Sequence, residues 1–249
     1  MKKLGLIGYP LGHSFSKTYY LNKFEQENIR DIDYDLYPIE HISLFEELYQ
    51  SDAAYVGFNV TIPHKQHIIP YLTDLSTEAK EIEAVNCITI QRIGDDVVLK
   101  GHNTDAYGFQ YSLQPLLKPQ HTHALVLGNG GAAKAVCYTL KQLGIDYQIV
   151  SRSKENGDLT YGELNQEIIG DHKLIINCTP LGTYPAIEAY PPIPYEFVTE
   201  DHLLYDLIYN PEETAFLAMG KSQGATTKNG YEMLVLQAEQ NWKIWNYEY

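Results

Sequence analysis

Cysteine is scarce in this chain, and the few cysteines present form no pattern. Cys87, Cys137 and Cys178 are the only three among 249 residues, and no two of them are close in sequence. An odd count without a C-x-x-C spacing argues against a disulfide framework and against a zinc knuckle. The nine histidines show no pair at ligand spacing in a suitable context, so we expect no metal site.

Basic residues and long apolar runs are also in short supply. The 18 Lys and Arg residues are outnumbered by 32 Asp and Glu residues, which gives a net charge of −14. Nucleic acids and anionic membranes bind to a positive field, so we expect neither as a partner. No run approaches the ~18 apolar residues of a membrane-spanning helix, and MKKLGLIGYP is too short and broken for a signal peptide. We therefore expect a cytoplasmic protein.

Short strand-like runs alternate with helical patterns through both halves of the chain. KKLGLIG, DYDLYPI and YVGFNVTI are typical of strands, and NCITIQRIGDDVVLKG predicts a hairpin, whereas YEMLVLQAEQNWKIWN has helical spacing. This alternation predicts an α/β fold with mostly parallel sheets. We place a domain boundary near GHNTD, residues 101–105, and expect the last helix to pack back onto the first half. Asn210 and Pro211 predict a helix start, as cap and first residue.

The segment VLGNGGAAKAV contains a glycine-rich turn between a strand and a helix. Gly128, Gly130 and Gly131 precede Ala133, which stands at the third fingerprint position. Such a turn lets a pyrophosphate approach the backbone at a helix N-terminus. An ordinary glycine-rich turn is the alternative. The next strand ends in IVSRSK, which has no carboxylate for a ribose 2′-hydroxyl, and Arg152 suits a 2′-phosphate. The sequence therefore predicts NADP rather than NAD.

Polar side chains cluster where the strands of the first half end, in GYPLGHSFS, NVTIPHK, AVNCI and GHNTD. In NVTIPHK, Pro63 ends the strand and places Lys65 just beyond it. The carboxyl ends of parallel strands line one crevice, so these side chains could converge there. Each also has a simpler interpretation: the serines could cap a helix, Asn86 could satisfy a turn, and Asp105 could be a helix N-cap.

These motifs together resemble the shikimate dehydrogenase family along nearly the whole chain. The matching stretches are IGYPLGHSFS, FNVTIPHK, EAVNCI, GHNTDAYGF, LGNGGAAKAV, INCTPLG, YDLIYNPEET and NGYEMLVLQAEQNWKIW. The resemblance implies NADPH-dependent, reversible reduction of 3-dehydroshikimate to shikimate, in chorismate and aromatic amino acid biosynthesis. It implies an α/β substrate-binding and catalytic domain with a mostly parallel sheet, residues 1–104 plus 232–249. A Rossmann-type NADP domain, residues 105–231, would face it across a cleft.

The resemblance also implies roles for individual residues. Lys65 and Asp105 would be catalytic and would pass the proton at the C3 oxygen. The substrate-binding residues would be Ser14, Ser16, Asn59, Thr61, Asn86, Tyr209 and Gln237. The cofactor-binding residues would be Gly128, Asn129, Gly130, Gly131, Ala132, Ser151, Arg152, Ser153, Lys154, Thr179, Leu207, Gly230 and Glu78. The family includes monomers and dimers, so a homodimer stays open.

The chain departs from the family pattern at a few positions. Lys17 stands where a proline usually follows the second serine, Ser151 and Ser153 replace the usual Asn and Thr around Arg152, and Asn129 replaces a small residue. Three alternatives remain: a dehydrogenase that also oxidises quinate, a non-catalytic NADP- or metabolite-sensing module, and another two-domain NADP enzyme such as a methylene-tetrahydrofolate dehydrogenase. Intact Lys65 and Asp105 argue against the second, and the HSFS and NVTIPHK pair argues against the third.

Overall fold

The computed structural model describes residues 1–12 and 14–247, and the chain forms two compact units. Unit 1 consists of Met1–Thr104 and Ala238–Tyr249, and unit 2 consists of Asp105–Gln237. The first boundary therefore falls within the GHNTD segment. The second falls at residue 237, inside the last helix, rather than at residue 231. Both units are α/β, and unit 2 has the Rossmann-type arrangement of a parallel sheet, so the predicted fold class is confirmed.

The sheet of unit 1 has six strands in the order β2-β1-β3-β5-β6-β4. Their bounds are β1 Lys2–Gly8, β2 Ile32–Pro38, β3 Tyr55–Val60, β4 Asp74–Leu75, β5 Cys87–Ile93 and β6 Asp96–His102. Three neighbouring pairs are parallel, whereas β5 runs antiparallel to both of its neighbours. β5 and β6 form the predicted hairpin, with Gly94 at a positive φ of 62° in its turn.

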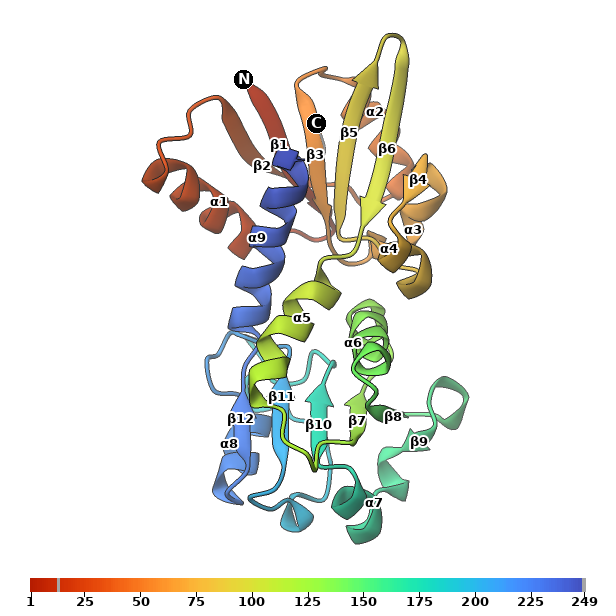
Figure 1. The fold of residues 1–249 in the computed structure, drawn as a ribbon, viewed down its shortest axis with the longest axis vertical. Helices are drawn as coiled ribbons and strands as arrows, with labels where there is room; N and C mark the ends of the chain where they lie inside the picture. The colour runs from red at the N-terminus through yellow and green to blue at the C-terminus, as the bar shows by residue number, and fades with distance from the viewer. Residues whose placement is uncertain (13, 248–249) are drawn as a thin grey trace. The chain divides into compact units, whose positions relative to one another are not determined.

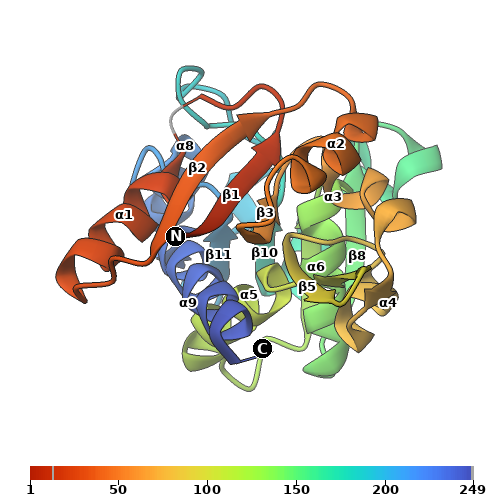
Figure 2. The same cartoon turned by 90° about the horizontal axis from the view of Figure 1, so that it is seen from above.

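Helices cover both faces of this sheet. Their bounds are α1 Phe15–Gln26, α2 Phe45–Gln50, α3 His64–His67, α4 Thr77–Ile82 and the last ten residues of α9 Tyr231–Tyr247. α1 and this part of α9 share a cluster of buried side chains with β1 and β2, and α2 and α4 pack on the opposite face with β3, β5 and β6. Figures 1 and 2 show the two layers. The last helix thus packs on the first half, as the sequence predicted.

Unit 2 contains an all-parallel six-stranded sheet in the order β12-β11-β10-β7-β8-β9. Its strands are β7 His123–Leu127, β8 Asp146–Ser151, β9 Leu159–Thr160, β10 Leu174–Asn177, β11 Leu203–Asp206 and β12 Thr226–Lys228. The central strands β7, β10 and β11 read as almost continuous apolar runs because helices and loops bury both of their faces.

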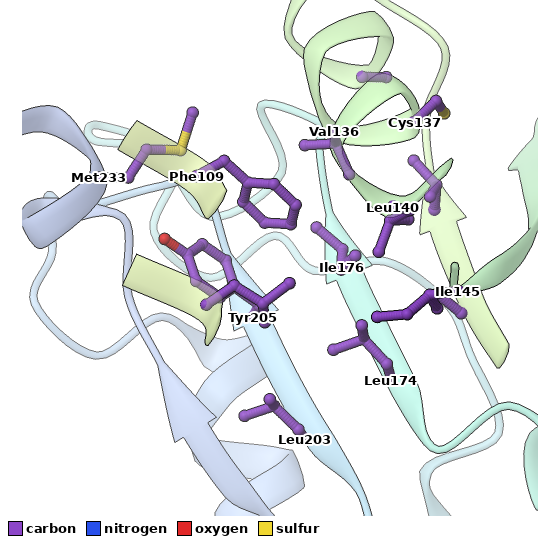
Figure 3. Close-up of a cluster of buried hydrophobic side chains, with 14 residues drawn as sticks. Phe109, Val136, Cys137, Leu140, Ile145, Leu174, Ile176, Leu203, Tyr205 and Met233 are labelled. Atoms are coloured by element: carbon purple, nitrogen blue, oxygen red, sulfur yellow. The ribbon is translucent and has the colours of Figure 1, made fainter. Parts of the chain in front are cut away.

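The helices of unit 2 complete its two hydrophobic cores. They are α5 Asp105–Leu113, α6 Gly131–Gln142, α7 Gln166–Asp171, α8 Ala215–Ser222 and the first turns of α9. Figure 3 shows one core, in which Phe109 of α5 meets Tyr205 of β11 edge to face at 5.1 Å between ring centroids. Among residues 1–12 and 14–247, no helix combines the length and apolar character needed to cross a membrane.

The predicted start of one helix was wrong. We expected Asn210 to cap a helix beginning at Pro211, but α8 begins at Ala215 with Thr214 as its N-cap. The Thr214 hydroxyl accepts from the Leu217 N–H and donates to the buried Asp206 carboxylate at 2.6 Å. A cap that also satisfies a buried carboxylate is worth more than an exposed asparagine, so the helix starts four residues later.

Candidate active site

The glycine turn of unit 2 connects β7 to α6 and has the backbone of a dinucleotide site. Gly128 has a φ of 98°, a value that favours glycine, and its N–H donates to the Val150 carbonyl on β8. A side chain at Gly128 would also meet the Thr179 methyl group at 3.0 Å. Gly130 caps α6, and a Cβ at Gly130 or Gly131 would meet nothing within 4 Å. The helix N-terminus therefore lies open for a pyrophosphate.

The turn after β8 holds the residues that the sequence assigned to the 2′-phosphate. Ser151 is buried, and its hydroxyl donates to the Ser153 carbonyl and accepts from the Ser153 N–H. Lys154 donates to the Glu163 carboxylate at 2.9 Å and to the Asp158 carbonyl. Lys154 and the donors of Thr160 hold the pKa of Glu163 at about 2. The hydrogen bonds of Ser151 and Lys154 thus shape the turn, and both Arg152 and Lys154 are exposed cations.

Asn129 links this turn to the glycine loop. Its side-chain amide donates to the Asn156 carbonyl at 2.8 Å, and the Asn156 amide in turn donates to the Ser153 hydroxyl at 2.9 Å. The departure from a small residue therefore adds a bond between the two loops that a dinucleotide would touch. Ala132 lies in the first turn of α6 and is half-buried.

A buried polar network lies at the ends of β10 and β11. Asp206 is fully buried, and its carboxylate accepts from the Asn177 amide, the Ile208 N–H and the Thr214 hydroxyl. Burial is the main cause that raises the Asp206 pKa from 3.8 to about 6. Asn177 also accepts from the Thr179 hydroxyl at 2.6 Å and from its N–H at 3.0 Å. The network fixes the loop that contains Thr179.

Two further predicted cofactor residues meet at the start of α9. The Gly230 N–H donates to the Ile208 carbonyl, and a Cβ at Gly230 would lie 2.1 Å from the Leu207 carbonyl oxygen. Only a glycine permits this approach. Tyr209 follows and is 37% exposed, with a pKa raised by burial. Gln237 is buried on α9 and donates to the Leu234 carbonyl. These residues all belong to unit 2.

In unit 1, two buried asparagines join the ends of β3 and β5. The Asn59 amide nitrogen donates to the Asn86 carbonyl at 3.1 Å, and that carbonyl also accepts from the Val60 N–H. The Asn86 side chain donates to the Thr104 hydroxyl and accepts from the Thr104 N–H at 2.8 Å. Thr104 donates onward to Asn241 of α9 at 2.6 Å. Asp105 follows directly and begins α5, as its first residue rather than its cap.

Lys65 lies in the short helix α3 just after Pro63. Its carbonyl accepts from the Val85 N–H at 2.8 Å, which joins this helix to the residue preceding Asn86. The Lys65 side chain is half-buried, and so is Thr61, which directly follows β3. The structure thus brings Asn59, Thr61, Lys65 and Asn86 to one region of unit 1.

Ser14 and Ser16 flank the start of α1. Ser14 is the N-cap, and its hydroxyl accepts from the Lys17 N–H at 3.4 Å. The Lys17 ammonium pairs with Asp35 at 2.6 Å, and this pairing is the main cause that lowers the Asp35 pKa. The extra charge near the serines is therefore neutralised locally. Glu78 is exposed in the first turn of α4.

Several residues of these networks were not predicted from the sequence. Tyr34, Asn177, Asp206 and Asn241 are all buried, and each bonds a predicted residue or its neighbour. The sequence did contain a signal for Asn241. It stands four positions after Gln237, so both polar side chains lie on one face of a helix whose remaining buried residues are apolar. Across the described part of the chain, no group of three or more His, Cys, Asp or Glu side chains could hold a metal ion.

A chain with a glycine turn opening onto a helix in the parallel sheet of one unit, and with hydrogen-bonded buried amides and a lysine in the other, has the features of a dinucleotide-dependent dehydrogenase. Residues 6–88 match the model of the shikimate dehydrogenase substrate binding domain. The shikimate dehydrogenase (NADP(+)) of Methanosphaera stadtmanae is 35% identical, over 96% of this chain and 89% of that protein. The chain belongs to the shikimate dehydrogenase family.

Solved structures agree with this assignment. Shikimate dehydrogenase 1 from Peptoclostridium difficile matches with a TM-score of 0.84 and 35% identity, over 99% of this chain and 92% of that one. Shikimate 5-dehydrogenase from Thermus thermophilus, solved in complex with NADP(H) and shikimate, matches with a TM-score of 0.85 and 29% identity, over 98% and 93% of the two chains.

Proposed function

We propose that this protein catalyses the reversible NADPH-dependent reduction of 3-dehydroshikimate to shikimate, a step of chorismate and aromatic amino acid biosynthesis. The main support for the proposal is the pair of pre-organised side-chain amides in unit 1, those of Asn59 and Asn86, in the same region as Lys65. Asn59 and Asn86 are held by buried hydrogen bonds, and the Lys65 backbone is bonded next to Asn86. Family relatives are named for this activity, and one is solved with both ligands.

The chain's own residues would divide the work as follows. Asn59, Thr61, Asn86, Asp105 and Gln237 would bind the ring hydroxyls, and Ser14, Ser16 and Tyr209 the carboxylate. Lys65 and Asp105 would hold the proton that moves to or from the C3 oxygen. General acid–base help of this kind contributes about 10² to 10⁴ in rate. Hydrogen bonds already fix the rotamers of the Asn59 and Asn86 side chains. Substrate binding therefore costs little further side-chain entropy at these two residues.

The residues of unit 2 fit NADP. The open turn from Gly128 to Ala132, with Asn129, would hold the pyrophosphate, and Arg152 would meet the 2′-phosphate, within a turn shaped by Ser151, Ser153 and Lys154. Thr179, Leu207 and Gly230 would line the nicotinamide, and Glu78 would contribute from unit 1. When bound, NADPH supplies the hydride that reduces the carbonyl.

The proposal also covers the class of ligand, the cellular location and the oligomeric state. The charge of −14 supports small-molecule ligands rather than nucleic acid. The free cysteines Cys87, Cys137 and Cys178 fit a reducing compartment, which supports a cytoplasmic location. A homodimer is tested by light scattering of the purified protein.

The test is the absorbance change of the nicotinamide during shikimate oxidation with NADP, with NAD and with quinate run beside it. Turnover of shikimate with NADP, lost in Lys65→Ala, supports the reaction and the catalytic residue. Comparable kcat/KM with quinate would assign the dual-specificity activity instead. Tight NADP binding without turnover of either substrate would refute an enzymatic role and support a sensing module.

A further inference from the structure

Tyr34 is a buried tyrosine whose hydroxyl reaches a proposed substrate residue. It lies on β2, is 1% exposed, and its ring packs against Tyr20 at 4.6 Å and Trp245 at 6.4 Å between centroids. The phenol donates to the Asn59 side-chain oxygen at 2.8 Å. β1 lies between β2 and β3, so the ring spans a whole strand to make this bond. No assigned role accounts for this hydroxyl.

The Asn59 side chain makes one hydrogen bond to the Asn86 backbone carbonyl and one to Tyr34. Because a carbonyl can only accept, the first bond determines the direction of the second. The Asn86 backbone carbonyl has no proton, so the Asn59 group facing it must be the amide nitrogen, as the 3.1 Å bond shows. The Asn59 oxygen must then face Tyr34, and the phenol must donate to it. Burial holds the pKa of Tyr34 well above its ordinary value, so this donor keeps its proton.

The same phenol determines how the Ser16 hydroxyl is used. The Ser16 side chain interacts with the phenol and acts to lower the pKa of Tyr34, against the larger effect of burial. Tyr34 has one proton, and that proton is committed to Asn59, so Ser16 must donate to the phenol oxygen. A chain of donors therefore runs from Ser16 through Tyr34 and Asn59 to the Asn86 carbonyl, and it ends on a backbone atom of the β-sheet.

We propose that Tyr34 is a positioning residue for substrate binding, which orients the Asn59 amide so that its second N–H is presented to a ring hydroxyl. This inference rests on the proposed function, since it takes Asn59 as a substrate residue. An asparagine held only by the Asn86 carbonyl could rotate about its side-chain torsions. The Tyr34 bond fixes the second end of the amide, and the aromatic cluster of Tyr20 and Trp245 fixes Tyr34.

The test compares Tyr34→Phe with Tyr55→Phe. Phenylalanine keeps the ring in its packed site and removes only the hydroxyl. Tyr55 is a matched control, because it is also a buried tyrosine of unit 1 and its ring packs against Tyr37 and Phe58. We expect Tyr34→Phe to raise KM for shikimate about five- to tenfold, the usual effect of one lost hydrogen bond. KM for NADP and the stability change should match those of the control.

A double-mutant cycle separates positioning from general loosening. If Tyr34 acts through Asn59, Tyr34→Phe should raise KM for shikimate about five- to tenfold in the native background and hardly at all in Asn59→Ala. An unchanged KM for shikimate, an equal rise in KM for NADP, or the same effect in both backgrounds would overturn the Tyr34 proposal while the enzyme remains a shikimate dehydrogenase. Absence of shikimate turnover in the unmodified protein and in Tyr55→Phe would overturn the proposed function and this inference with it.

Discussion

The buried Asp206 carboxylate should make the stability of this protein depend on pH in a specific direction. The perturbation is Asp206→Asn, which keeps the size of the side chain and removes its ionisation. An asparagine oxygen can still accept from Asn177 and Ile208, and its nitrogen can donate to the Thr214 hydroxyl, so the variant should fold. The comparison isolates the free energy of ionising one buried group.

The magnitude follows from the shifted pKa. Burial raises the Asp206 pKa from 3.8 to about 6, a difference of roughly 2 pKa units or about 3 kcal/mol. The folded state holds the proton more tightly than the unfolded state, so the folded protein loses stability as the pH rises from about 4 to about 6. Asp206→Asn does not titrate and lacks this loss. Its free energy of unfolding should therefore gain about 3 kcal/mol relative to the native protein between pH 4 and pH 7.

Urea unfolding at several pH values between 4 and 7 measures this difference. Asp95→Asn is the matched control, because it makes the same chemical change at an exposed turn residue. Cys178 and Tyr195 also interact electrostatically with Asp206, but burial raises both of their pKa values above their ordinary range, so neither titrates in this window. If the difference in free energy of unfolding between Asp206→Asn and the native protein stayed constant with pH, the reasoning would be refuted.

Three other predictions concern the site. Lys65→Ala should lower kcat by about 10² to 10⁴ with little change in KM for shikimate; a change confined to KM would assign Lys65 to binding. Arg152→Ala should raise KM for NADP about tenfold or more and leave KM for NAD unchanged, and equal effects on the two would contradict a 2′-phosphate contact. Ser14 caps α1 by accepting from the Lys17 N–H, which leaves its proton for a carboxylate, whereas we infer that the Ser16 proton is directed to Tyr34. Ser14→Ala should therefore raise KM for shikimate more than Ser16→Ala, and the reverse order would contradict the donor chain.

Much of the fold could be predicted because local patterns and tertiary packing agree. The apolar runs of β7, β10 and β11 and the glycine turn at Gly128 each predict their own conformation. The start of α8 could not be predicted, because Asn210 and Pro211 are good local start residues and the deciding partner, Asp206, is a buried carboxylate. The antiparallel run of β5 against β3 was also not predicted, since strand direction depends on the path of the whole chain.

For the candidate site, the sequence indicated the segments involved but did not reveal the partners that hold their side chains. Motifs with glycine, serine and asparagine at strand ends indicated which segments matter, because few other roles demand those residues there. The partners that hold them could not be found in the same way. Tyr34 reads as an ordinary core tyrosine of a strand, and only the three-dimensional structure shows that its hydroxyl reaches Asn59. Ser151 and Lys154 remain predicted phosphate ligands, and their hydrogen bonds to Ser153 and Glu163 could not be foreseen from the sequence.

The division of α9 between the two units has a consequence for how the chain folds on the ribosome. Unit 2 is continuous in sequence, so every residue of its cores has been made once Gln237 has been added to the chain. Unit 1 needs Trp245, which is 3% exposed and donates to the Ile88 carbonyl at 3.0 Å. Nascent unit 1 must therefore wait, with part of one face of its sheet uncovered, until Trp245 has been translated, although most of unit 1 is made first. A chaperone that binds exposed apolar strands would meet unit 1 during that interval.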